Sequence, residues 1–197
     1  MNISINKPAL DQLFYQAHSA HAFDGQELSD HEIQNIYDLV KWAPTAFNSQ
    51  PARLVVVRGA SAKARLTATL APSNIPQVES ASATIIVAYD AKFYQHLNVL
   101  WPMMDVRPLF SNNKQAAIDT AFRNSSMQGA YLIMALRALG YDCNAMSGFD
   151  ANALNAEFFP QNDCQANFLI TFGKGLLHGF NPRNPRLEFG QVVTVLD

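Results

Sequence analysis

AAIDTAFRNSSMQGAYLIMALRAL, the sequence of residues 116–139, is long enough for roughly six turns of helix. From Met127 to Leu139 this helix is apolar on nearly every side, and that pattern predicts burial all round. Gly140 follows, at a position where helices often end. One sheet from a chain of 197 residues would not cover such a helix completely. We therefore expect a partner subunit to supply the rest of the cover.

Three short apolar runs on either side of this helix are typical of buried strands, at residues 54–57, 84–89 and 168–172. Shorter helices are expected at residues 8–18, 60–70 and 150–158. Strands separated by helices indicate an α+β or α/β sandwich. Residues 93–110, rich in aromatics and prolines, fit neither pattern.

A capping box predicts where one further helix begins. Ser29 and Glu32 have the spacing in which each side chain bonds the backbone of the other residue. Ile33, Ile36 and Val40 then follow helical spacing, and Pro44 ends the pattern.

Composition narrows the class of protein. Charged residues make up only 15% of the chain, against about a quarter in ordinary domains, which agrees with a partly covered surface. A net charge of −2 gives no electrostatic footprint for nucleic acid. No apolar run approaches the length of a membrane span, and no hydrophobic signal segment opens the chain, so we expect a cytoplasmic protein. Cys143 and Cys164 are expected to be reduced core residues.

Residues 18–24, His-Ser-Ala-His-Ala-Phe-Asp, could hold an anion such as phosphate through two imidazoles and a hydroxyl. His18, His21, Asp24 and His31 are also candidate metal ligands. A solvated loop with incidental histidines is the simplest interpretation of this segment on its own.

Three further segments allow a functional and a plain interpretation. Residues 43–51 could bring backbone groups close to a flat ring, or could simply connect a helix to a strand. Residues 144–150, in which Gly148 permits a tight turn, could present backbone N–H groups, or could be an ordinary turn. Residues 181–186 carry two arginines that could clamp a phosphate, although surface arginines are usually solvated.

Taken in order, these segments resemble the nitroreductase family over almost the whole chain. Residues 18–23 resemble the family's Arg-Ser-x-Arg-x-Phe motif, which binds the FMN phosphate and ribityl chain, with histidines where arginine or lysine is usual. Residues 43–51 resemble the Pro-Ser-x-x-Asn-x-Gln-Pro segment, with Thr45 in the serine position. In the family this segment touches the flavin ring from the partner subunit.

The resemblance continues toward the C-terminus. Asn74 falls where the family has an asparagine at the flavin pyrimidine edge, and Gln77 stands at a position that is often lysine. Residues 146–150 resemble the Pro-Ile-Glu-Gly-Phe-Asp segment, whose backbone amides lie beside the flavin N5. Asn181 and Arg183 fall on a Lys-x-Arg pair of which only the arginine is kept.

The resemblance implies one FMN-binding domain at residues 1–197, with an α+β fold in three layers. A central, mostly antiparallel sheet would be flanked by helices, and two copies would form an intertwined homodimer. It implies cofactor contacts from His18, Ser19, His21, Pro44, Thr45, Ala46, Asn48, Asn74, Gln77, Met146, Ser147, Gly148, Asn181 and Arg183.

The implied activity is an FMN-dependent oxidoreductase that takes hydride from NADH or NADPH in a ping-pong scheme through flavin N5. Residues 121–128 and 146–150 most resemble the RutE-like malonic semialdehyde reductases, which form 3-hydroxypropanoate in pyrimidine degradation. Arg107 and Arg123 are candidate cations for such a small carboxylate. The alternatives are a nitroaromatic or quinone reductase, a metal-dependent hydrolase and a flavin-binding protein without catalysis.

Overall fold

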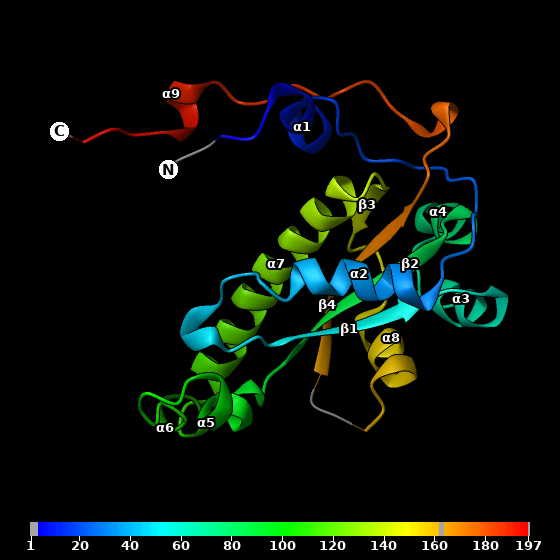
Figure 1. The fold of residues 1–197 in the computed structure, drawn as a ribbon. Helices are drawn as coiled ribbons and strands as arrows, with labels where there is room; N and C mark the ends of the chain where they lie inside the picture. Colours follow the sequence, from blue (N-terminus) through cyan, green and yellow to red (C-terminus); the bar gives the residue numbers. More distant parts are fainter. Residues whose placement is uncertain (1–3, 162–163, 197) are drawn as a thin grey trace.

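The centre of the chain is a four-stranded antiparallel sheet in the order β1-β2-β4-β3 (Figure 1). The computed structural model describes residues 4–161 and 164–196, so the ends and residues 162–163 of the expected 1–197 domain lie outside the described residues. The strands are β1 (Ala52–Val57), β2 (Ala83–Asp90), β3 (Asp142–Met146) and β4 (Cys164–Gly173).

Two helices cover one face of the sheet, α2 (Asp30–Val40) and α7 (Lys114–Ala138). Ile85 and Val87 of β2 point into this layer, where Leu132 and Leu136 of α7 are fully buried. The predicted capping box is confirmed at the start of α2, because Ser29 and Glu32 bond each other's backbone N–H groups.

Three shorter helices cover the other face, α3 (Ala60–Thr67), α4 (Ile75–Ser80) and α8 (Ala151–Phe158). Ile86 alternates with Ile85 and Val87 along β2 and so packs with Leu66 of α3 and Leu154 of α8. Helices on both faces of an antiparallel sheet confirm the expected three-layer α+β sandwich.

A small lobe closes one end of the sandwich. Its elements are η4 (Phe93–His96), α5 (Leu97–Leu100) and α6 (Pro108–Ser111), which account for most of the segment that fits no sequence pattern. Phe93 and Phe110 stack edge to face with ring centroids 4.9 Å apart, and Ala117 and Ala121 of α7 complete the cluster.

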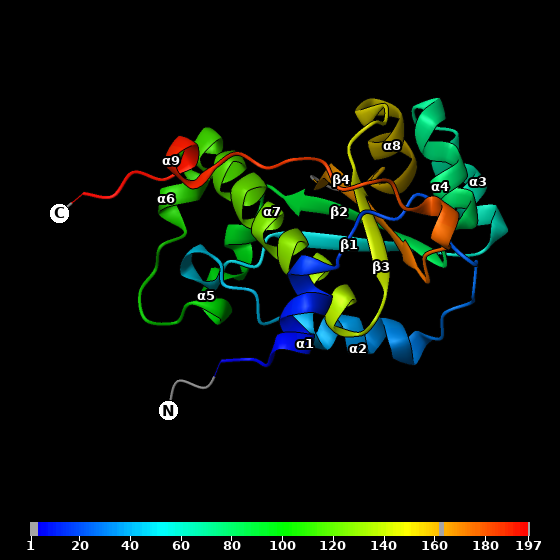
Figure 2. The ribbon, with the colours of Figure 1, turned by 90° about the horizontal axis from the view of Figure 1, so that it is seen from above.

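Both terminal segments lie along the end of the molecule opposite the lobe (Figures 1 and 2). The helix expected at residues 8–18 is wrong in its second half: α1 (Lys7–Leu10) passes into a π-helical turn, η1 (Asp11–Tyr15), where Gln16 N bonds Asp11 O. After η5 (Leu177–Gly179) the chain runs as an exposed arm that includes a short helix, α9 (Phe189–Val192).

Three expectations need correction or qualification. The helix expected at 60–70 ends at Thr67, and Leu70 instead pairs with Phe149 as an isolated bridge. β3 was not predicted. Burial of α7 on every side does not hold within one chain, because Phe122, Met127 and Tyr131 are 40–50% exposed. Within the described residues, we find no helix with the length and apolar character of a membrane span.

Candidate functional site

The segment at residues 18–23 is built into the fold at the free edge of β3. Ser19 bridges Cys143 of β3, Ala20 bridges Phe180, and Phe23 bridges Gly175. Ala20 is fully buried and Phe23 nearly so. The interpretation of this segment as a solvated loop is therefore wrong for its backbone and for these two side chains, whereas Ser19 and Asp24 are exposed. His18 and His21 are held on an ordered backbone, half-buried, beside the sheet edge.

Arg183 lies next to this segment. Its Nη2 donates to the carbonyl oxygens of Tyr15 (2.8 Å) and Ala17 (2.9 Å), at the end of η1. These bonds bring the exposed guanidinium, which arrives from the C-terminal arm, within one residue of His18 in the sequence. Asn181 is exposed on the same arm. Arg183 and the start of the segment at residues 18–23 thus lie close together although they are distant in the sequence.

Side-chain amides gather a short way along β3. The Nδ2 of Asn144, a buried residue of β3, donates to Oε1 of Gln77. Asn74 Nδ2 donates to the carbonyl oxygen of Gly148 at 3.0 Å. Of the sequence-predicted residues, Gln77 therefore meets β3 itself, and Asn74 meets the segment that follows β3. Asn144 lay in a segment singled out from the sequence but was not itself selected as a site residue.

Gly148 allows Asn74 and Ala71 to approach the backbone closely. A Cβ at this position would lie 2.7 Å from Asn74 Nδ2 and 3.4 Å from the Cβ of Ala71. Its carbonyl also accepts from Ala71 N at 2.9 Å. The predicted tight turn at Gly148 is confirmed, because Phe149 N donates to Ser147 O at 3.1 Å across it, and the turn forms without positive φ. Ser147, next to it, is exposed, whereas Met146 is buried at the end of β3.

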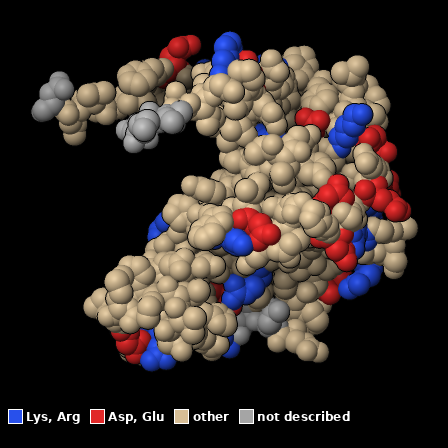
Figure 3. All heavy atoms as spheres, in the orientation of Figure 1, with Lys and Arg blue, Asp and Glu red and all other residues tan. Residues whose placement is uncertain are grey.

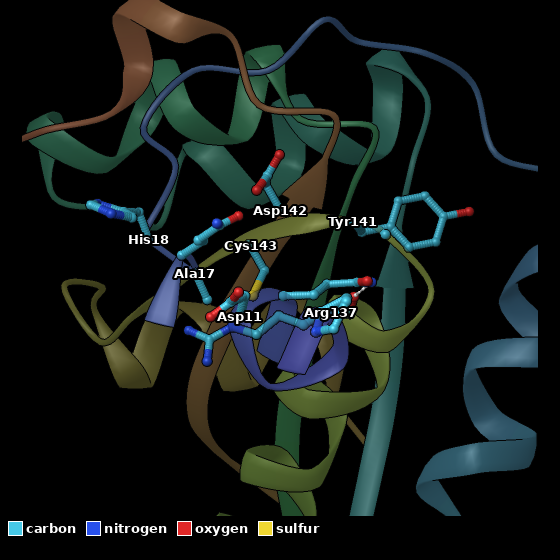
Figure 4. Close-up of a pocket in the computed structure, with 11 residues that line it drawn as sticks. Asp11, Ala17, His18, Arg137, Tyr141, Asp142 and Cys143 are labelled. Atoms are coloured by element: carbon cyan, nitrogen blue, oxygen red, sulfur yellow. Dashed lines mark hydrogen bonds between the residues drawn. The ribbon is translucent and has the colours of Figure 1, made fainter. Parts of the chain in front are cut away.

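A pocket of about 630 Å³ opens between the N-terminal segment and the end of α7 (Figure 4). Its polar lining includes the guanidinium of Arg137, the carboxyl groups of Asp11 and Asp142, and the imidazole of His18. Arg137 Nη1 donates to Leu13 O at 3.0 Å. Burial raises the pKa of the Cys143 thiol on the pocket wall, so this side chain stays protonated near neutrality. Of the sequence-predicted residues, only His18 lines this pocket.

Pro44, Thr45, Ala46 and Asn48 occupy a separate place. They lie on the loop before β1, which is the opposite edge strand of the sheet from β3. This loop includes η2 (Ala46–Asn48) and faces the lobe, where Asn48 Nδ2 donates to Leu100 O at 3.1 Å. Within one chain the sequence-predicted residues therefore fall into two groups at opposite edges of the sheet (Figure 1). We call the loop at residues 43–51 the β1-edge loop. The β3-edge group consists of residues 18–23, Asn74, Gln77, Asn144, residues 146–148, Asn181 and Arg183.

The two candidate substrate cations differ in their surroundings. Arg107 forms a bidentate ion pair with Asp105, at 2.8 and 2.9 Å, and this contact lowers the pKa of that carboxyl to about 2. Its charge is therefore already compensated. Arg123 is exposed on α7, one residue before the buried Asn124.

The structure does not assemble the metal-ligand set considered from the sequence. Among residues 4–161 and 164–196, no group of three or more His, Cys, Asp or Glu side chains has an arrangement that could hold a metal ion. His31 instead lies on α2, where its Nδ1 contacts Asn35 Nδ2 at 3.3 Å. The metal-dependent hydrolase has no supporting geometry in this part of the chain.

Comparisons with known proteins agree with this fold. A protein of Rhodopseudomonas palustris (strain TIE-1), provisionally named an NADH dehydrogenase/NAD(P)H nitroreductase, is 48% identical over 196 residues and the alignment covers both chains fully. A nitroreductase-type structure from Bacillus subtilis superposes with a TM-score of 0.86 at 25% identity, over 97% of this chain and 100% of that one.

A third comparison shows the same fold. A nitroreductase-type structure from Exiguobacterium sibiricum, solved in complex with FMN, gives a TM-score of 0.83 at 22% identity, over 99% of this chain and 100% of that one. The profile of the Nitroreductase family matches residues 15–174. This chain therefore belongs to the nitroreductase family.

Proposed function

We propose that this chain is an FMN-dependent NAD(P)H oxidoreductase in which residues 1–197 form one cofactor-binding domain. The observation that carries the proposal is the β3-edge group. His18 and His21 lie near Ser19 at one end of it, where Arg183 bonds the carbonyl of Ala17, and side-chain amides lie at the other end through Gln77 and Asn74. These two kinds of donor suit the two polar ends of FMN, a phosphate and a ring edge that both donates and accepts hydrogen bonds.

Different residues of the β3-edge group would bind each end of FMN. His18, Ser19, His21 and Arg183 would hold the phosphate by charge and hydroxyl donation. Asn74, Gln77 and Asn144 would bind the ring edge. Backbone N–H groups of Ser147 and Gly148 would orient the ring, with Met146 beneath them. When bound, FMN supplies hydride transfer between NAD(P)H and the substrate, and the protein supplies binding and orientation.

A homodimer follows from the separation of the two groups of residues. The β1-edge loop carries Pro44, Thr45, Ala46 and Asn48 but lies at the sheet edge opposite β3. A second copy can bring its loop to the β3-edge group of the first, and the exposed apolar side chains of α7 would then be covered. Figure 3 shows a hollow between the terminal segments and the lobe, with few charged side chains on the surfaces around it.

For the substrate, we propose malonic semialdehyde, which would be reduced to 3-hydroxypropanoate. Residues 121–128 and 146–150 carry the resemblance to reductases of that type. Arg123 is the better candidate for the substrate carboxylate, since Arg107 is paired with Asp105. A nitroaromatic or quinone reductase is the second candidate, supported by the name of the relative from Rhodopseudomonas palustris.

An absorption spectrum of the purified, FMN-reconstituted protein tests the cofactor, and NAD(P)H oxidation with each acceptor tests the reaction. We expect oxidised-flavin bands that bleach with NADH or NADPH and return when acceptor is added. A higher kcat/KM for malonic semialdehyde than for a nitroaromatic or a quinone supports the first substrate, and the reverse order supports the second. Flavin bands without NAD(P)H oxidation indicate a non-catalytic flavoprotein, and a protein that stays colourless rules the proposal out.

A further inference from the structure

The β1-edge loop has an unusual backbone. Phe47, Asn48 and Gln50 all have positive φ, at 53°, 50° and 42°, and none of them is glycine. L residues rarely adopt this left-handed conformation, and it persists where the surrounding structure fixes it. Bonds within the loop, such as Gln50 N to Thr45 Oγ1 at 3.2 Å, support this shape, and contacts from outside the loop add to them.

Two buried amides of α7 supply such contacts from the core side. Asn124 Oδ1 accepts from Ala46 N at 2.8 Å, and Gln128 Oε1 accepts from Ala52 N at 2.9 Å. The two side chains are four residues apart and so share one face of the helix. They are 3% and 7% exposed, and the amide of Asn124 is itself oriented by a bond from Nδ2 to Thr120 O.

The lobe holds the loop from the other side. The Phe47 ring packs edge to face on Trp101 and Phe110, with centroids 5.6 and 6.1 Å away. Asn48 bonds Leu100 O. In the same loop the Ser49 hydroxyl is buried and has no hydrogen-bond partner among the described residues. A buried hydroxyl without a partner is expected where contacts from outside impose the backbone shape of a loop.

We propose that Asn124 and Gln128 are positioning residues, which fix the left-handed shape of the β1-edge loop and, through Phe47, the place of the lobe. Burying an amide side chain without a hydrogen bond is unfavourable. The hydrogen bonds that the side-chain oxygens of Asn124 and Gln128 accept from the loop therefore explain why amides stand at these buried positions. The consequence for the reaction rests on the proposed function, because the loop carries Thr45, Ala46 and Asn48. The structural part of the proposal, which concerns the shape of the loop and the place of the lobe, does not rest on the proposed function.

Hydrogen exchange of the purified full-length protein tests the structural part. Gln128→Met and Asn124→Leu remove the acceptors at similar volume, and Gln128→Glu keeps an acceptor oxygen. The matched control is Gln115→Met on the same helix, whose exposed amide contacts Asp119 instead of the loop. We expect amides of residues 46–52 to exchange about tenfold faster in the first two variants, as for one lost hydrogen bond. Gln128→Glu should restore the slower rate, and Gln115→Met should not change it.

The proposal fails if the loop exchanges at the wild-type rate in both Gln128→Met and Asn124→Leu. It also fails if β2 accelerates as much as the loop, since that result indicates a general loss of stability. The second measurement is steady-state kinetics with FMN and a quinone, where we expect KM for the acceptor to rise about three- to tenfold with a smaller change in kcat. An unchanged KM with a loosened loop overturns the functional part, whereas wild-type protein without flavin overturns only the proposed function.

Discussion

Gly179 packs tightly against the backbone of the β3-edge group. A Cβ there would lie 2.6 Å from the backbone nitrogen of Ala22 and 3.0 Å from its carbonyl oxygen. The Gly179 carbonyl also accepts from His21 N at 2.8 Å. We expect Gly179→Ala to destabilise the protein by about 1–3 kcal/mol, as for other overpacked sites. Because the clash is with backbone, residues 18–23 must move, and FMN affinity should fall with stability.

Chemical denaturation and a flavin titration measure these two effects. His178→Ala is the matched control, since it lies in the same turn but is exposed, and it should change stability by less than about 0.5 kcal/mol. Equal stability of Gly179→Ala and wild type would show that the backbone of Ala22 can adjust freely.

The residue scale also shows how much of the site could be predicted. Residue type alone allows a phosphate site or a metal site at His18 and His21, and a solvated loop was the simplest interpretation. Order along the chain and family resemblance favoured FMN. The contact between Gln77 and Asn144 joins residues 67 positions apart, and no local pattern in the sequence indicates it.

At the scale of elements, prediction succeeded where burial imposes a regular pattern. β1, β2 and α7 are apolar over most of their length and were predicted close to their true bounds, whereas for β4 only the apolar half at residues 168–172 was predicted. β3 was missed because Asp142–Met146 contains no β-branched residue and lies at an edge of the sheet, with only β4 beside it among the named strands. The three helices of the lobe are each four residues long and are set by tertiary packing.

The start of α2 allows a prediction about pH. Bonds from the Ser29 backbone and side chain lower the pKa of Glu32 below its ordinary value of 4.5, and a bond from Tyr141 adds to this. A lowered folded-state pKa contributes stability that is present above pH 4.5 and lost as the pH falls through the folded value. Glu32→Gln should therefore have a lower Tm than wild type at pH 7. This difference should shrink on acidification below about pH 4.

Thermal unfolding from pH 7 to pH 3 measures this difference. Glu27→Gln removes the same charge just before the helix but outside the capping box, so its Tm should follow wild type at every pH. A Tm difference between Glu32→Gln and wild type that is constant down to pH 3 would mean that the charge of Glu32 does not stabilise α2.

At the scale of the whole molecule, the sequence predicted that α7 needs cover from outside the chain, but it could not show which surface lacks it. The structure identifies that surface by exposure, since Phe122, Met127 and Tyr131 lie uncovered along one helix. The C-terminal arm is uncovered as well, with Leu187 and Phe189 both about 70% exposed. Exposed apolar side chains on these two parts of the chain agree with the proposed homodimer, in which a second copy would cover them.

The arm therefore provides the test of the homodimer. Leu187→Gln combined with Phe189→Gln removes apolar surface from the arm but leaves Arg183 and its bonds to residues 14–17 unchanged. If the arm packs on a second copy, the double variant should shift from dimer to monomer in analytical ultracentrifugation at micromolar concentration. It should also lose most of its FMN, because the β1-edge loop of the partner would no longer reach the β3-edge group. Arg186→Gln, in the same arm, bonds only neighbouring carbonyls and should stay dimeric and yellow. A double variant that becomes monomeric yet keeps its flavin would place the whole cofactor site within one chain.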